Sequence, residues 1–296
     1  MADETAGPLW AGEPQTGGWR RYLVADVFTA VPLEGNQLAV FPDGRGLDDG
    51  LLQRTALELN LSETVFFLPA EQGGDARVRI FTKASELPFA GHPVLGSAFV
   101  LGQVLGAARV TLETGAGLVP VELERDGDRI TFGRMEQPIP EAEPFEQAEE
   151  LLAALGVRQS GLPVEAYRNG PRHVYVELAS EAEVAALRPD QSALSLLHIG
   201  VSTFAGQGPN WTTRMFAPFL GVPEDPATGS AAGPLAVHLA RHGRIGFGEE
   251  IEISQGAQIG RPSRLYARAD GSADKIERVL VGGSAVVVAR GEYRLG

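Results

Sequence analysis

The chain has 296 residues, of which 44% are hydrophobic and 21% charged, with a formal net charge of −13 and no cysteine. This length favours two domains, and the composition is that of a globular protein. The absence of cysteine excludes disulfides, thiolate metal sites and thiol nucleophiles. The acidic balance argues against a nucleic-acid partner, which would face clustered Lys and Arg.

The N-terminus and the apolar runs bear on the compartment. Met1 is followed by acidic sequence with Gly and Pro, and no apolar run reaches the roughly 18 residues that span a bilayer. We therefore expect neither a signal peptide nor a membrane partner. The predicted compartment is the cytoplasm.

The first half of the chain reads as strands around one apolar helix. Residues 1–19 are expected to be a flexible extension. An amphipathic helix is predicted at 48–59, and a helix at 93–105 that is apolar on all faces and so should be enclosed. Strands are expected at 22–28, 38–41, 63–68, 76–81, 108–114, 117–124 and 128–134.

The second half repeats this style after a segment that we interpret as a linker. That segment, 136–146, has three prolines and four glutamates. An irregular stretch is expected at 204–224. Helices are predicted at 146–155 and 230–242, and strands at 173–178, 196–202, 250–255, 263–269 and 277–290. The predicted domains are the extension 1–19, an N-terminal lobe 20–135, with 290–296 as a candidate further strand of that lobe, and a C-terminal lobe 136–289.

The two apolar helices begin with related sequences. Pro88-Phe-Ala-Gly-His92 precedes the first and Pro226-Ala-Thr-Gly-Ser230 the second, and the offset is 138 residues for Pro88/Pro226, Gly91/Gly229 and His92/Ser230. A chance match of short helix starts is the plainer alternative. The apolar helix at the same offset in each half favours duplication, and so predicts an α+β protein of two pseudo-symmetric lobes.

Helix starts of this kind are candidate anion sites. The first N–H groups of a helix have no intrahelical partner and carry about half a positive charge. Two such ends facing one another across a cleft would hold a carboxylate and stabilise a developing anion. Taken singly, Gly91 and Gly229 are ordinary helix-entry residues.

Three titratable residues near these helix starts can each be interpreted as structural or as catalytic. His92, in the first turn of a helix, is expected to stay neutral and able to exchange protons, or else to be a structural histidine. Asp225 before the second helix is a common capping residue. Glu63 at the start of a strand is a solvated carboxylate, or a base whose pKa rises if it faces a dry cleft.

Four stretches together resemble the PhzF-like family, named for an isomerase of phenazine biosynthesis. They are Asp26-Val-Phe-Thr-Ala-Val-Pro-Leu-Glu-Gly-Asn36, Asn60-Leu-Ser-Glu-Thr64, Leu87-Pro-Phe-Ala-Gly-His-Pro93 and Glu224-Asp-Pro-Ala-Thr-Gly-Ser-Ala-Ala-Gly233. The resemblance runs from about Arg21 to the C-terminus and includes Thr213-Arg-Met-Phe-Ala-Pro218 and Gly260-Arg-Pro-Ser263.

The resemblance implies a diaminopimelate-epimerase-like fold, with each lobe a β-barrel-like sheet wrapped around a central helix and the site between the lobes. Epimerases of that fold carry a Cys at the head of each helix, where this chain has Ala90 and Thr228. Two-thiol racemisation is therefore not available. The resemblance also implies a homodimer and no metal or organic cofactor.

Site residues are carried over from the resemblance one by one. Glu63 matches the family's proton-shuttling glutamate, and its supporting residues match His92 and Asp225. The residues that match substrate contacts are Asn36, Gly91, Gly229 and Ser230. The segment 204–210 and Arg214 are expected to help set the substrate.

The predicted function is that of a cofactor-independent isomerase. Glu63 would move a proton between carbons of a small carboxylate-bearing substrate that resembles an amino or hydroxy acid. One alternative is an epimerase or racemase of such acids, which needs an acid or base on the opposite face. Another is a non-catalytic binding protein on the same fold, which an exposed Glu63 would favour.

Three weaker motifs have plainer explanations. His238 and His242 have the i, i+4 spacing of a helical metal pair, but Leu239 stands where a metalloprotease helix has Glu. We interpret this pair as histidines that favour a helix C-terminus before Gly243. Residues 115–117 read as a hairpin turn, since no helix follows, and 241–244 is too short for a nucleic-acid patch.

Overall fold

The computed structural model describes residues 18–295, and these form two compact units. Unit 1 contains the described residues up to Glu136 together with those from Gly282 onward, and unit 2 is Gln137–Val281. The expected extension 1–19 lies outside the described residues except for its last two, and of these Trp19 already begins a strand. Among the described residues, no helix has the length and apolarity to cross a membrane.

Unit 1 has a nine-stranded sheet and two helices. In chain order the elements are β1 (Trp19–Val27), β2 (Asn36–Phe41), α1 (Asp49–Leu59), β3 (Glu63–Leu68), β4 (Ala76–Phe81), the short β5 (Glu86–Leu87), α2 (Gly91–Leu105), β6 (Arg109–Thr114), β7 (Gly117–Asp126), β8 (Arg129–Gln137) and β18 (Ala285–Arg294). The strand order is β18-β1-β2-β3-β4-β6-β7-β8, with β5 paired to β4. Only β2–β3 and β4–β6 are parallel in this series.

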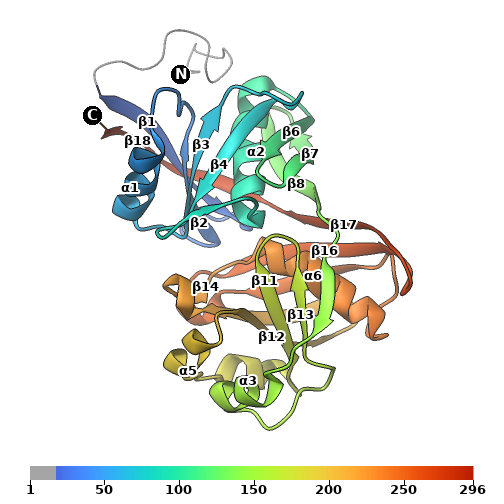
Figure 1. Cartoon of the computed structure of the whole chain (residues 1–296). Coiled ribbons are helices and arrows are strands. Elements are labelled where there is room, and N and C mark those ends of the chain that lie inside the picture. The colour runs from blue at the N-terminus through green and yellow to red at the C-terminus, as the bar shows by residue number, and fades with distance from the viewer. Residues whose placement is uncertain (1–17, 296) are drawn as a thin grey trace. The chain divides into compact units, whose positions relative to one another are not determined.

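The helix α2 is the centre of unit 1, as its all-round apolar sequence predicts. Its first twelve residues, Gly91–Gly102, are all buried, and it packs against β1, β2, β3, β6, β7 and β18. Figure 1 shows it enclosed by the strands of this unit. Gly96 lets β2 approach, because a Cβ there would lie 2.7 Å from the Leu38 side chain.

The outer helix α1 covers a second, smaller core. Asp48 caps it by accepting a hydrogen bond from the Leu51 backbone N–H. Its buried face contacts stacked rings on the sheet, with the Phe41 and Phe66 centroids 4.9 Å apart. The sheet of unit 1 is therefore held from both faces, and the starts of β2 and β3 are fixed relative to α2.

Unit 2 has a second sheet around α6 (Gly229–Arg241). Its other elements are β9 (Glu141–Pro144), α3 (Ala148–Leu155), β10 (Glu165–Arg168), β11 (Arg172–Glu177), α4 (Glu181–Ala186), α5 (Gln191–Leu196), β12 (Gly200–Gln207), β13 (Asn210–Ala217), the 3-10 turn η1 (Pro218–Leu220), β14 (Val222–Asp225), β15 (Glu250–Gln255), η2 (Ala257–Ile259), β16 (Ser263–Gly271) and β17 (Ile276–Gly283), whose last two residues belong to unit 1. The strand order is β9-β10-β11-β12-β13-β15-β16, with β14 paired to β13.

The two units have the same strand pairing, which supports the duplication. In unit 1 the pairs β2–β3, β3–β4, β4–β6 and β6–β7 run parallel, antiparallel, parallel and antiparallel. The pairs β11–β12, β12–β13, β13–β15 and β15–β16 of unit 2 run in the same sequence of directions. The central helices α2 and α6 begin at Gly91 and Gly229, which are the 138 residues apart that the sequence repeat predicts.

Three sequence expectations for elements were wrong. The segment 136–146 is not a plain linker, since β8 continues to Gln137 and β9 pairs with β10. The segment 204–224 is not irregular, because β12 and β13 form a hairpin there. The strand expected at 277–290 is two strands that meet at Ser284. The four-residue β9, which is exposed throughout and ends at Pro144, lacks the apolar alternation that makes a strand visible in sequence.

Candidate active site

A tight loop between β1 and β2 positions Asn36 at the start of β2. Buried Asp26 accepts a hydrogen bond from the Leu33 backbone N–H at 2.7 Å. Gly35 has a φ of +68°, and a Cβ there would lie 2.4 Å from the Val27 carbonyl oxygen, so a larger residue would not fit. The loop thereby fixes Asn36 as the first, fully buried residue of β2.

Glu63, His92 and Asn36 form one contact chain in unit 1. Glu63 begins β3, where it lies opposite Leu38 of β2 in the parallel ladder. Its Oε2 is 3.1 Å from Nε2 of His92, and the Glu63 side chain is 16% exposed. On the other side of the ring, Nδ1 of His92 is 3.3 Å from the Asn36 side-chain nitrogen. The predicted base and its supporting histidine are therefore in direct contact.

Burial keeps the His92 ring neutral. Desolvation lowers the pKa of His92 to about 3, although a backbone hydrogen bond with Gln37 favours the charged form. A neutral imidazole has one proton and one free nitrogen. Its Nε2 can therefore donate to an ionised Glu63 while Nδ1 accepts from the Asn36 amide. It can accept from a protonated Glu63 when the ring proton is on Nδ1 and the Asn36 amide turns its oxygen toward that nitrogen. The pair accommodates both protonation states that an acid/base glutamate must visit.

The start of α2 adds backbone donors beside this pair. Ala90 is the N-cap in an extended conformation and makes no side-chain capping bond. The N–H groups of the first turn, at Gly91 and His92, have no partner within the helix, and no acidic side chain lies in that turn. The helix end therefore presents a partial positive charge next to Glu63 and His92.

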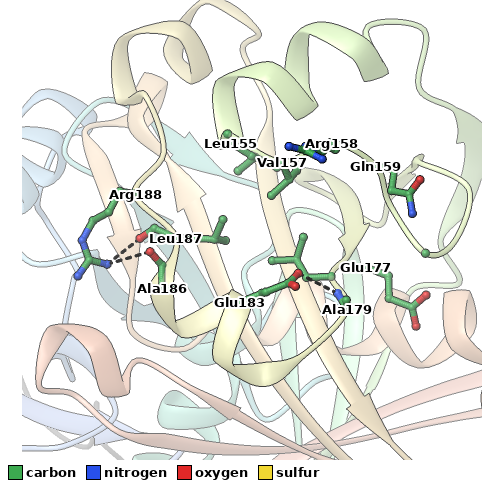
Figure 2. Close-up of a pocket in the computed structure, with 13 residues that line it drawn as sticks. Leu155, Val157, Arg158, Gln159, Glu177, Ala179, Glu183, Ala186, Leu187 and Arg188 are labelled. Carbon is green, nitrogen blue, oxygen red and sulfur yellow. Dashed lines mark hydrogen bonds between the residues drawn. The ribbon is translucent and has the colours of Figure 1, made fainter.

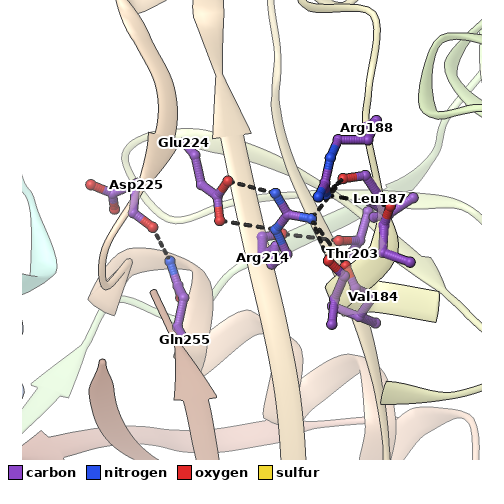
Figure 3. Close-up of polar contacts among 10 residues, drawn as sticks. Val184, Leu187, Arg188, Thr203, Arg214, Glu224, Asp225 and Gln255 are labelled. Atoms are coloured by element: carbon purple, nitrogen blue, oxygen red, sulfur yellow. Dashed lines mark hydrogen bonds and ion pairs between the residues drawn. The ribbon is translucent and has the colours of Figure 1, made fainter. Parts of the chain in front are cut away.

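In unit 2, Asp225 is held by a network of side-chain hydrogen bonds. Asp225 ends β14 and is 8% exposed. Thr228, the N-cap of α6, donates its hydroxyl to Asp225 Oδ2 at 2.5 Å. Gln255, the last residue of β15, donates to the Asp225 carbonyl oxygen at 2.9 Å (Figure 3). It also donates to Thr228 Oγ1 at 3.0 Å. The N-cap of α6 is Thr228, three residues after Asp225, so Asp225 is not itself the capping residue.

A buried ion pair anchors the strand that carries Asp225. Arg214 on β13 makes two hydrogen bonds to Glu224, at 2.9 and 2.7 Å, and both side chains are at most 10% exposed (Figure 3). Its remaining nitrogen donates to the carbonyl oxygens of Val184, Ala185 and Leu187 at the end of α4. Arg214 was expected to help set the substrate, but the structure gives it a structural role.

Ser230, the second residue of α6, is also held by a buried histidine. Its Oγ is 3.0 Å from Nε2 of His173 on β11. Burial lowers the pKa of His173 to about 4, so this ring is neutral too. Asn169 donates to the Ser230 carbonyl oxygen at 3.1 Å, and Gln137 donates to that of Gly229 at 2.9 Å.

The two helix starts thus have parallel arrangements. In each unit the second helical residue, His92 or Ser230, contacts a polar side chain of an earlier strand, which is Asn36 of β2 in unit 1 and His173 of β11 in unit 2. The structure brings Asn36, Glu63, Gly91 and His92 together in unit 1, and Asp225, Gly229 and Ser230 together in unit 2. His173 and Gln255 were missed in the sequence, where an isolated His and Gln in strands carry no distinguishing signal.

Unit 2 also has a cavity of about 780 Å³ that lies apart from the candidate site residues. It is bounded by the end of α3, the end of β11 and α4, and its charged lining includes Arg158, Glu177, Glu183 and Arg188 (Figure 2). None of the candidate site residues lines it. Two of its charges are already engaged within the unit, since Glu177 pairs with Arg244 and Glu183 accepts from a backbone N–H.

Comparison with known proteins gives one family. A family model described as phenazine biosynthesis-like protein matches residues 25–291. The trans-2,3-dihydro-3-hydroxyanthranilate isomerase of Pseudomonas aeruginosa is 53% identical over 276 residues, which cover 93% of this chain and 99% of that protein.

Solved structures agree with this result. The structure of a predicted epimerase from Pseudomonas aeruginosa is 33% identical, with a TM-score of 0.78, and the match covers 93% of this chain and 99% of the other. A phenazine biosynthesis protein of the PhzF family from Bacillus anthracis has a TM-score of 0.79 at 24% identity and the same coverage, which shows the shared fold.

The chain belongs to the phenazine biosynthesis-like family and is an isomerase. The family, the enzyme class and the diaminopimelate-epimerase-like α+β fold predicted from the sequence are thereby confirmed.

Proposed function

We propose that this isomerase converts trans-2,3-dihydro-3-hydroxyanthranilate by moving one ring proton, with Glu63 as the acid and base. The identity of 53% over nearly the whole of both chains supports the choice of substrate. The observation that carries the mechanism is the 3.1 Å contact between Glu63 and His92, because it joins a carboxylate to a neutral imidazole at the start of a helix.

The chemistry of this substrate calls for one well-placed base. An anthranilate reduced at C2 and C3, with a hydroxyl on C3, keeps two ring double bonds that conjugate C3 with C1 and its carboxylate. The C3 proton is therefore acidified. Its removal leaves an anion delocalised over the ring and the carboxylate, and return of a proton at C1 gives an isomer. One C–H bond breaks, one forms, and no electron leaves the system.

Glu63 would carry that proton. As a carboxylate it accepts the proton from C3, and as a carboxylic acid it returns the proton at C1. His92 Nε2 stays in contact with Oε2 through both states, as donor in the first and as acceptor in the second. Positioned proton transfer of this kind contributes about 10²–10⁴-fold in rate.

Asp225 and the two helix starts would bind the substrate. We propose that the Asp225 carboxylate accepts hydrogen bonds from the substrate amine or hydroxyl. The backbone N–H groups at Gly91 and at Gly229–Ser230 suit a carboxylate and a developing anion, because they are fixed donors at positive helix ends. Asn36 is expected to hold the His92 ring rather than to contact the substrate first, given its 3.3 Å contact with Nδ1.

An epimerase of a small amino or hydroxy acid is the second candidate. The 33% identity to a predicted epimerase favours it. It requires a second acid or base on the opposite face of the carbon. Cysteine is absent from the chain, and the Thr228 hydroxyl is engaged with Asp225, which leaves Asp225 for that role.

Purified protein mixed with trans-2,3-dihydro-3-hydroxyanthranilate in deuterated water separates the two candidates. The proton-shift proposal predicts loss of the absorbance of the diene conjugated with the carboxylate, and an isomeric product in the NMR spectrum. The epimerase proposal predicts that the diene persists, while small amino or hydroxy acids invert at a carbon that gains deuterium. A protein that binds the substrate without either change would contradict both enzyme proposals.

Two further proposals rest on the sequence alone, the first on its N-terminus and apolar runs and the second on the family resemblance. We propose that the enzyme acts in the cytoplasm and that it is a homodimer. Light scattering coupled to gel filtration would report twice the 31.4 kDa of one chain if the second proposal is right, and the mass of one chain if it is wrong.

A further inference from the structure

A cluster of three ligand-type side chains lies at the other end of α6. His238 and His242 lie one turn apart near the C-terminus of this helix, and Glu165 begins β10. Glu165 Oε2 is 3.2 Å from His238 Nδ1 and 3.0 Å from His242 Nε2. One ligand atom from each residue lies within 4.8 Å of the other two.

Strand β10 supplies the acidic ligand that the histidine pair lacks on its own helix. The i, i+4 histidine pair alone has no acidic partner on its helix, since Leu239 follows His238. In the fold, β10 places Glu165 against both imidazoles. The attribution of this pair to a plain helix C-terminus therefore omitted the third group.

We propose that Glu165, His238 and His242 bind one divalent transition-metal ion, with Zn²⁺ as the best fit. Two imidazole nitrogens and one carboxylate oxygen form a ligand set typical of zinc. Ligands at roughly 2.0–2.1 Å from a tetrahedral ion lie about 3.3 Å apart, close to the observed 3.0–3.2 Å between the oxygen and each nitrogen. A water molecule would take the fourth position.

The surrounding side chains hold these ligands in place. The His238 ring is fully buried and stacks on Tyr175, with centroids 5.7 Å apart, while the rings of Tyr167 and Phe204 meet its edge and face. The Tyr167 hydroxyl donates to Glu165 Oε2 at 2.8 Å, so the carboxylate is fixed by an outer partner. These ligand side chains are therefore already ordered before an ion binds.

The end of the helix also suits a cation. His238 and His242 lie at the C-terminus of α6, where the unpaired carbonyl groups carry a partial negative charge.

An ion can reach this position from solvent. The His242 side chain is 22% exposed and that of Glu165 is 15% exposed, while His238 closes the inner side. Arg241 approaches the cluster through the Tyr167 hydroxyl, at 3.4 Å.

The position implies a structural role. His238 is nine residues from Gly229 along α6, or roughly 14 Å at 1.5 Å per residue. An ion there would link β10 to α6 without contacting the helix start. We therefore expect it to stabilise unit 2 and to leave the proton transfer to other groups.

Zinc binding to the untagged, full-length protein tests this proposal. After treatment with EDTA and dialysis, the protein is titrated with Zn²⁺ by calorimetry and with Co²⁺ by its visible absorption. The expected result is one ion per chain, a tetrahedral Co²⁺ spectrum and a rise in the thermal midpoint with Zn²⁺. Failure of the wild-type protein to bind either ion would overturn the proposal.

Matched histidine variants assign the ligands. His242→Gln lies at the partly exposed helix end, where it leaves the core intact, and should weaken Zn²⁺ binding about 100-fold. Glu165→Gln should have a similar effect. His198→Gln removes an exposed histidine elsewhere in unit 2 and should change nothing. Unchanged affinity in His242→Gln, or an equal loss in His198→Gln, would refute the assignment.

Discussion

The buried pair of Arg214 and Glu224 gives a quantitative test of how Asp225 is held. We consider Glu224→Gln, which keeps the shape of the side chain and removes its charge. The Arg214 guanidinium would remain buried, with side-chain exposure of 6%, and would lose its counter-charge. The strand β14, which ends at Asp225, would lose its strongest attachment to β13.

The expected cost follows from the contacts that remain. Removal of one partner of a buried ion pair costs about 3–5 kcal/mol. The glutamine oxygen can still accept one hydrogen bond, and three carbonyl oxygens of the α4 region still accept from Arg214. We therefore expect the lower end of the range, about 3 kcal/mol in the free energy of unfolding.

Urea unfolding followed by tryptophan fluorescence measures this loss. Trp211 is buried in β13, the same strand as Arg214, and so reports on unit 2. The control is Glu143→Gln, because Glu143 is 58% exposed in its ion pair with Arg172 and such pairs contribute about 0–1 kcal/mol. If Glu224→Gln cost no more than the control, the argument that this pair anchors β14 would fail.

Two other predictions concern pH and a positioning residue. The pKa of His92 is lowered to about 3 and that of His173 to about 4 by burial, whereas the unfolded chain titrates near 6.5. Below about pH 6.5 the unfolded chain binds protons that the folded chain does not, so urea unfolding should show stability falling between about pH 7 and 4, less steeply in His173→Gln. A flat wild-type profile would contradict the burial of these rings. Gln255→Leu removes the donor to Thr228 and to the Asp225 carbonyl oxygen, and should lower kcat about tenfold with a smaller change in KM. Gln72→Leu, at an exposed position of unit 1, should match the wild type in the same assay, and equal kcat values for both variants would remove Gln255 from the site.

Much of the fold was readable because its core elements are strongly patterned. The strands at 63–68 and 76–81 were predicted to the residue, since apolar runs there flank a clear Gly73-Gly74 turn. The enclosed helix α2 was visible from apolar residues on every face, and α6 from an apolar run. Their common offset of 138 residues anticipated two units whose strands pair in the same order.

What escaped prediction depends on contacts between distant residues. The short β9 and β10 have little apolar alternation, and they exist because they pair with each other and with β11. The same pairing carries Glu165 to His238 across 73 residues of sequence. His173 and Gln255 owe their roles to the residues they touch, which no local pattern encodes.

The candidate site was predictable in part. The position of His92 at a helix start follows from Gly91 and the preceding Pro88, and its neutrality follows from burial. The contact with Glu63 required the parallel ladder of β2 and β3, which sequence alone does not define. The ion pair of Arg214 with Glu224 depends on the pairing of β13 with β14, which the sequence alone does not define.

The most direct test of the central claim is the rate of proton transfer in Glu63→Gln. This variant keeps the side-chain shape beside His92 and removes the base. The proposal predicts that conversion of trans-2,3-dihydro-3-hydroxyanthranilate in deuterated water slows by about 10²–10⁴-fold, while Glu58→Gln on the exposed face of α1 keeps the wild-type rate. Conversion by Glu63→Gln at the wild-type rate, with the same deuterium content in the product, would contradict the assignment of Glu63 as the acid and base.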